Sequence, residues 1–142
     1  MKAAGSQELD RGRTRRAIRY AGAVVIVVMG AAVAGRTTVG RALAAELRWT
    51  FVDADDLHPP PNVETKGASL RAIVAHAIER RESLVLACPP LSERDRDALR
   101  AGLHLVRFVV LDAMPALDDA LHVDAARPPE QIRAAIRTEF GV

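Results

Sequence analysis

Short runs of apolar residues alternate along the chain with segments in which apolar residues recur every three or four positions. Continuous apolar runs of strand length occupy residues 24–29, 84–88 and 106–111, and shorter candidates lie at 50–53 and 121–124. Uninterrupted runs of this kind are typical of strands that are buried on both faces of a parallel sheet. The pattern therefore predicts about five strands.

Helical periodicity fills the intervals between these runs. Ser92 with Asp95 resembles a helix-capping box, and Pro128-Pro129 suits the first turn of a helix. Alternating strands and helices predict an α/β fold with a mostly parallel sheet covered by helices on both faces, a three-layer arrangement. The apolar positions that define three of the expected helices are Val39, Leu43 and Leu47; Leu70, Ile73, Val74, Ala77 and Ile78; and Ile132, Ala135, Ile136 and Phe140.

The composition is that of one globular domain with a basic extension. The chain has 142 residues, of which 49% are hydrophobic and only 4% aromatic, so the core must consist of aliphatic side chains. Residues 1–22 hold six basic and two acidic side chains, whereas the net charge of the whole chain is only +2. We predict a disordered basic arm at 1–22 and a single domain at 23–142. Without interleaved aromatic residues the arm gives little indication of nucleic-acid binding.

The same N-terminal region suggests an alternative, an export signal. Arg15-Arg16 precedes an apolar run at 21–35 that ends in Ala32-Val33-Ala34. That run is too short to span a bilayer, and cleavage after it would remove the first predicted strand. We therefore favour a protein without a membrane partner. Cys88 is the only cysteine, which favours a reducing compartment and predicts a cytoplasmic location.

A candidate phosphate-binding loop runs from Gly30 to Thr38, between the first strand and the first helix. In a G-x-x-x-x-G-K-[ST] loop, backbone amides surround the phosphates, a lysine reaches the outer phosphates and a hydroxyl holds magnesium. We expect ATP and magnesium here, with Thr37 on the metal. The alternative is a plain strand-to-helix turn, because Arg36 replaces the lysine and the β-branched Val33 resists positive φ. The predicted nucleotide-binding residues are Gly30, Gly35, Arg36, Thr37 and Thr38.

An acidic segment follows about twenty residues later, at 51–63, with the sequence Phe-Val-Asp-Ala-Asp-Asp-Leu-His-Pro-Pro-Pro-Asn-Val. A carboxylate at the end of a parallel strand near a phosphate loop can accept the proton of a substrate hydroxyl. Asp55 is the candidate base, Arg36 a further catalytic candidate, and Asp53 a candidate for holding magnesium through water. The alternative is a polar loop without catalytic function. This segment resembles that of the gluconate kinases, and the likeness extends over residues 23–140 with gaps.

The resemblance implies a P-loop kinase that phosphorylates gluconate or a similar sugar acid, in which Asp55 and His58 contact the substrate. It also suggests a homodimer. The family has a Pro-Leu-Thr-Asp-x-Asp-Arg-type stretch after the Asn-Val pair, which is missing here, and a lid where this chain has only residues 113–120. Loss of lid arginines removes transition-state stabilisation. We therefore expect kinase activity that is weak or lost. The alternative is a non-catalytic nucleotide-binding or protein-interaction module.

Overall fold

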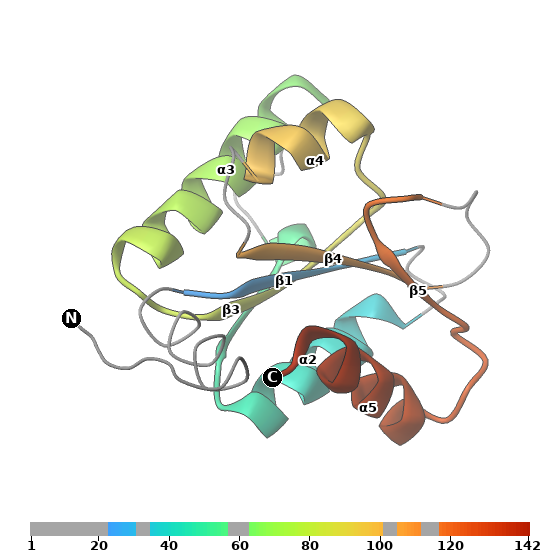
Figure 1. The fold of residues 1–142 in the computed structure, drawn as a ribbon. Coiled ribbons are helices and arrows are strands. Elements are labelled where there is room, and N and C mark those ends of the chain that lie inside the picture. The colour runs from blue at the N-terminus through green and yellow to red at the C-terminus, as the bar shows by residue number, and fades with distance from the viewer. Residues whose placement is uncertain (1–22, 31–34, 57–62, 101–104, 112–116) are drawn as a thin grey trace, which may run out of the picture.

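The computed structural model describes residues 23–30, 35–56, 63–100, 105–111 and 117–142, shown in Figure 1. The predicted arm at 1–22 lies outside these residues. Within the described part of the chain, no helix is long and apolar enough to cross a membrane. The elements in chain order are β1 (Val25–Met29), α2 (Arg36–Leu47), β2 (Thr50–Asp53), the 3-10 turn η2 (Ala54–Asp56), α3 (Val63–Glu79), β3 (Leu84–Cys88), α4 (Glu93–Arg100), β4 (Val106–Leu111), β5 (Leu121–Val123) and α5 (Pro129–Phe140).

The five strands form one parallel sheet in the order β2-β3-β1-β4-β5, which confirms the predicted fold class. Every residue of β1 and β3 is buried. β1 lies in the middle, with Val25 level with Leu84 of β3 and Val106 of β4. All five predicted segments became strands. Coverage of both faces explains the apolar runs of the inner strands β1 and β3, whereas the edge strands β2 and β5 are only partly buried and include Asp53 and His122.

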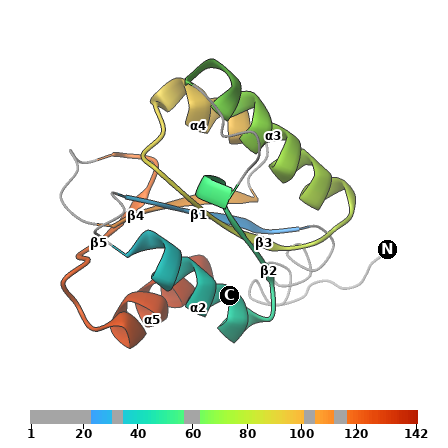
Figure 2. The same ribbon diagram turned by 180° about the vertical axis from the view of Figure 1, so that it is seen from behind.

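Helices cover both faces of the sheet, as Figures 1 and 2 show: α2 and α5 lie on one side, and α3 and α4 on the other. Alternate residues of β1 point to opposite faces, so that Val25, Val27 and Met29 join the core under α3 and α4, whereas Ile26 and Val28 join the core under α2 and α5. The three-layer arrangement therefore follows from the two-residue period of the strands. It places the N-terminus of α2 beside the carboxyl end of β1.

A surface ion-pair cluster joins helix α5 to helix α2. Arg133 donates to one oxygen of Glu46 at 3.0 Å and Arg137 to the other at 2.5 Å. The hydrogen bond from Arg137, followed by that from Arg133, lowers the pKa of the Glu46 carboxyl. Since all three side chains are partly exposed, we assign this cluster an orienting role and expect the core beneath to carry the stability.

β5 pairs with β4 in parallel although only a short connection joins them. Parallel crossovers normally need a dozen or more residues, whereas β4 ends at Leu111 and β5 begins at Leu121. The register explains how it is achieved: Leu121 lies level with Val109, and Val123 with Leu111. Because β5 begins beside the second half of β4, the chain needs to return along only a short part of that strand.

The helix α3 begins earlier than the sequence indicated. The apolar positions that predict this helix begin at Leu70, whereas the helix begins at Val63. Lys66, Gly67 and Ala68 provide no amphipathic pattern, so the first turns of this helix have no periodic signal. The other helix starts agree better: the Asp95 amide donates to the Ser92 hydroxyl at 3.1 Å, and Pro129 is the first residue of α5.

Gly40 lets α2 lie close against the sheet. A Cβ atom at this position would come within 2.9 Å of the Phe51 ring. We expect Gly40→Ala to lower the free energy of unfolding by about 1 kcal/mol, because overpacking costs about 1–3 kcal/mol and better helix propensity returns about 1 kcal/mol. Urea denaturation measures the change. Ala45→Gly, at an exposed site of the same helix, calibrates the propensity effect; a stabilised Gly40→Ala variant would contradict the close packing.

Candidate phosphate-binding site

Most of the predicted site residues lie at one edge of the sheet, where β1 and β2 end. Parallel strands bring their carboxyl ends to the same edge, and helix α2 begins there as well. Gly30 follows β1, Asp53 ends β2, and Asp55 lies in the turn η2 directly after it. The topology therefore brings residues 30, 36–37 and 53–55 together, as the sequence predicted.

Gly35 forms the N-cap of α2 in a left-handed conformation, with φ of 83°. Its carbonyl accepts the first helical hydrogen bond, from the Val39 amide at 2.9 Å. Gly35 has no side chain with which to cap the helix, and no side chain among the described residues accepts a hydrogen bond from the amides of its first turn. A helix start of this kind favours anions, because its free N–H groups and its dipole both present partial positive charge.

Asp53 organises the acidic side of the site. It is buried, with only 7% exposure, and one carboxylate oxygen accepts the Thr37 hydroxyl at 2.7 Å. The other oxygen accepts the backbone amide of Asp55 at 2.9 Å. Asp53 thus holds the hydroxyl on α2 and the position of Asp55 at the same time. The sequence suggested that Asp53 lies near a metal, but it did not indicate these two hydrogen bonds.

Arg36 takes a direction that the sequence did not reveal. Its side chain is 5% exposed and crosses the site, with Nη1 donating to the Gly30 carbonyl at 2.7 Å and Nη2 to the Asp55 carboxylate at 2.9 Å. Asp55 itself is 58% exposed. The Nε atom of Arg36 is buried and has no hydrogen-bond partner among the described residues. The guanidinium therefore links β1, α2 and η2 while one of its donors remains unsatisfied.

The other predicted site residues either have no bond to the site or lie outside the described part of the chain. Thr38 is exposed on α2, and its side chain forms no hydrogen bond with another described residue. His58 and the loop residues 31–34, Val33 among them, lie outside the described residues. The assignment of His58 to the substrate therefore stays a prediction.

The site's oxygen ligands suit magnesium bound together with phosphate. No cluster of three or more His, Cys, Asp or Glu side chains with the placement of a metal site occurs among the described residues. Magnesium is often held by one or two protein oxygens and completes its shell with phosphate oxygens and water. The Thr37 hydroxyl, oriented by the buried Asp53 carboxylate, fits that role.

A second charged cluster, which sequence reasoning missed, ties the segment before β5 to α4. Arg96 is buried and donates to both oxygens of Asp119, at 2.8 and 3.2 Å, and to the Leu91 carbonyl at 2.8 Å. Arg100 also pairs with Asp119 and lies over the Phe108 ring, 4.8 Å from its centroid. The spacing of Arg96 and Arg100 on one helix was the available signal; their partner is far along the chain.

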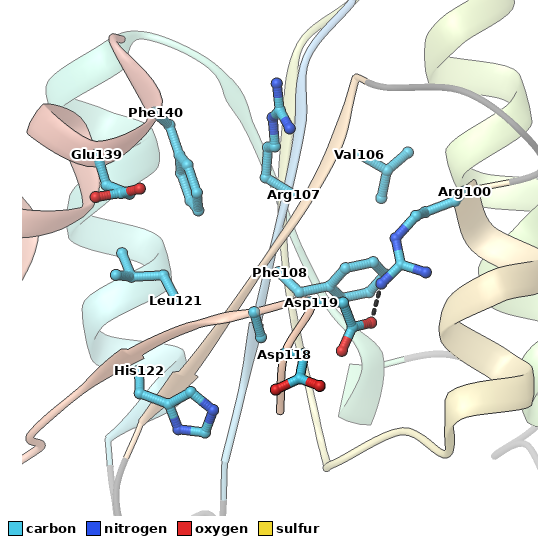
Figure 3. Close-up of a pocket in the computed structure, with 11 residues that line it drawn as sticks. Arg100, Val106, Arg107, Phe108, Asp118, Asp119, Leu121, His122, Glu139 and Phe140 are labelled. Atoms are coloured by element: carbon cyan, nitrogen blue, oxygen red, sulfur yellow. Dashed lines mark hydrogen bonds and ion pairs between the residues drawn. The ribbon is translucent and has the colours of Figure 1, made fainter. Parts of the chain in front are cut away.

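This cluster borders a cavity of about 490 Å³, drawn in Figure 3. The cavity lies beside Val106 and Phe108, in the first half of β4, and reaches Phe140 at the end of α5. None of the predicted site residues lines it. It is thus separate from the candidate phosphate site, which lies where the strands end.

Comparisons with known proteins point to a group of small-molecule kinases. No protein-family model matches the chain. The chain is 36% identical to a probable gluconokinase of Rattus norvegicus over 92 residues, which cover 55% of this chain and 50% of the rat protein. It is 32% identical to a gluconokinase of Gluconobacter oxydans over 101 residues, covering 61% and 57% of the two chains. The chain therefore spans about half the length of the curated relatives it matches.

Solved structures show the same fold. A gluconokinase from Sinorhizobium meliloti superposes with a TM-score of 0.65 and 24% identity, over 83% of this chain and 91% of that one. At this level of identity the likeness concerns the fold. It agrees with the parallel five-stranded sheet and its two helical layers.

Proposed function

Because this chain is related to the gluconokinases, a family of P-loop kinases, we propose that it binds ATP with magnesium at the start of α2 and transfers phosphate slowly to gluconate or a similar sugar acid. The observation that carries the proposal is the joint position of the Gly35 helix start, the Thr37 hydroxyl and the Asp55 carboxylate. These supply an anion site, a metal ligand and a base within one edge of the sheet.

The proposed chemistry divides among these residues. The amides of α2 and the Arg36 guanidinium bind phosphate oxygens, and Thr37 contributes a ligand to magnesium, which neutralises charge on the phosphates. Asp55 accepts the proton of the sugar-acid hydroxyl while the hydroxyl oxygen bonds to the terminal phosphorus of ATP. ADP leaves with the electrons of the broken P–O bond. Asp53 does not touch the reacting atoms and acts by positioning Thr37 and Asp55.

Two features favour slow transfer: the proposed base is already paired, and few residues are present to cover the phosphates. Asp55 is already paired with Arg36, so its carboxylate must exchange this partner before it can act on a hydroxyl. The connection from β4 to β5 is also short, which leaves few residues to cover the phosphates. Both observations favour, as the second candidate, a module that binds nucleotide without transferring phosphate.

Nucleotide binding is tested first by titration calorimetry of the full chain with ATP and magnesium. We expect binding by the wild type and at least a tenfold loss of affinity in Gly35→Val, since a β-branched residue resists the φ of 83°. The space around Gly35 is open, so the expected effect comes from the backbone and not from a clash.

Gly141→Val is the matched control. Gly141 also has a left-handed conformation, with φ of 66°, at the far end of α5. Both variants should lose about 1–2 kcal/mol of stability, whereas only Gly35→Val should lose affinity for ATP. Absence of binding by the folded wild type would refute the proposed function.

A further inference from the structure

We propose, building on the proposed nucleotide site, that Asp55 competes with nucleotide phosphate for the Arg36 guanidinium, so that the Arg36–Asp55 ion pair is a latch that phosphate must open. The pair joins α2 to η2 at 2.9 Å and lies at the start of α2, where Gly35 provides no capping side chain. A phosphate group bound there would approach the same donors that Asp55 now occupies.

The unequal burial of the two partners determines which of them moves. Arg36 is 5% exposed and remains bound to the Gly30 carbonyl, so the structure holds it in place. The Asp55 side chain is 58% exposed and water can solvate it once it is released. Exchange of Asp55 for phosphate therefore leaves no buried charge without a partner.

The unsatisfied Nε of Arg36 is a second, independent indication of an anionic ligand. A buried N–H donor without an acceptor is costly, and the described residues supply none for this atom. One carboxylate oxygen and one carbonyl engage the other two nitrogens. Phosphate can present several oxygens to the planar guanidinium, and in this way can satisfy a donor that the latched state leaves free.

Opening of the latch also prepares the proposed base. The Asp55 backbone stays fixed by its amide bond to Asp53 at 2.9 Å, so only its carboxylate needs to rotate away. Phosphate binding would then free this carboxylate for a substrate hydroxyl beside it. Without nucleotide, the ion pair keeps the base occupied, which couples the order of binding to the availability of the base.

The test compares ATP–magnesium affinity in two variants by calorimetry. Asp55→Asn removes the negative charge that competes with phosphate and should bind ATP about three- to tenfold more tightly than the wild type, about 0.7–1.4 kcal/mol. Asp56→Asn is the matched control: it removes a carboxylate from the same exposed turn but has no bond to Arg36. Equal gains in both variants would show a general charge effect and overturn the latch.

Three further measurements separate the latch from a purely structural role. Asp55→Asn should melt at a lower temperature than the wild type without ligand, yet show a larger rise in melting temperature when ATP and magnesium are added. In an Arg36→Met background the gain from Asp55→Asn should vanish. Asp55→Ser removes the same carboxylate through a different side chain and must shift the affinity in the same direction.

The outcomes distinguish this inference from the proposed function. Wild-type binding without a gain in Asp55→Asn and Asp55→Ser overturns the latch and leaves nucleotide binding intact. Tighter binding by Asp55→Asn and by Asp55→Ser than by the wild type, without a similar gain in Asp56→Asn, supports the latch. No binding by the wild type or by either variant refutes both proposals.

Discussion

Arg96→Leu is expected to lower the free energy of unfolding by about 3 kcal/mol, since breaking a buried ion pair from one side typically costs 3–5 kcal/mol. The Arg96 side chain is 7% exposed, and all three of its bonds end on Asp119 or the Leu91 carbonyl. Asp119 is 31% exposed and keeps its contact with Arg100, which places the estimate at the lower end. Leucine has a similar side-chain volume, so the loss of unfolding free energy measures the hydrogen bonds and the ion pair of Arg96.

Urea denaturation of Arg96→Leu and Arg133→Leu compares a buried with a surface arginine. Arg133 pairs with the exposed end of Glu46, so its replacement should change the unfolding free energy little. A similar loss in both variants would contradict the special role of Arg96. The midpoint of the urea transition should shift to lower urea concentration. The dependence of the unfolding free energy on urea should stay the same, because the variant changes a local contact between α4 and the segment before β5.

Acid sensitivity offers a second measurement on the same pair. The hydrogen bond from Arg96 is the main cause that holds the pKa of the Asp119 carboxyl below its usual value, against the effect of burial. A depressed folded-state pKa gives stability that is present above the unfolded value, about 3.9, and is lost as pH falls through the folded value. In Arg96→Leu the stability lost over this acidic range should be smaller.

The sheet could be predicted from sequence because each strand carries its own local signal. The run 84–88 predicted β3 to the residue, and 106–111 predicted β4. The docking of β5 could not be predicted in the same way, because it depends on register with β4, and register is set by packing and not by the composition of the strand.

For the candidate site, the sequence could indicate that several residues lie close together, but not the hydrogen bonds between them. Spacing along the chain identified Arg36, Thr37 and Asp55, since each follows a strand or opens a helix. The direction of the Arg36 side chain depends on a partner 19 positions away and on a carbonyl six positions before it. Long side chains have many rotamers, and only the packed structure selects among them.

The partners of Asp119 also could not be predicted from the sequence. The sequence places it in a short connection with no pattern, whereas in the structure it receives bonds from two arginines on α4. Arginines 96 and 100 face the same side of the helix because they are four residues apart. Sequence spacing could have indicated a paired anion site on α4, but not which carboxylate fills it.

Asp55→Asn is expected to reduce the phosphorylation of gluconate by a factor of about 100 to 10,000, the usual contribution of a general base. Wild-type turnover, measured in a coupled assay for ADP, should itself lie below the 1–100 per second that is typical of kinases. Asparagine keeps the shape of the side chain and leaves the amide bond to Asp53 in place, but cannot accept the hydroxyl proton. The loss should therefore appear in kcat.

The same variant gives opposite signs in two assays, which separates the two roles of Asp55. As base, Asp55 accelerates transfer; as partner of Arg36, it opposes nucleotide binding. Asp55→Asn should consequently bind ATP more tightly and turn over more slowly, whereas Asp56→Asn should change neither property greatly. Undiminished turnover in Asp55→Asn would assign the base elsewhere. Arg36→Lys completes the comparison: a lysine that restores rapid turnover would show that the guanidinium, and not the short β4–β5 connection, limits catalysis.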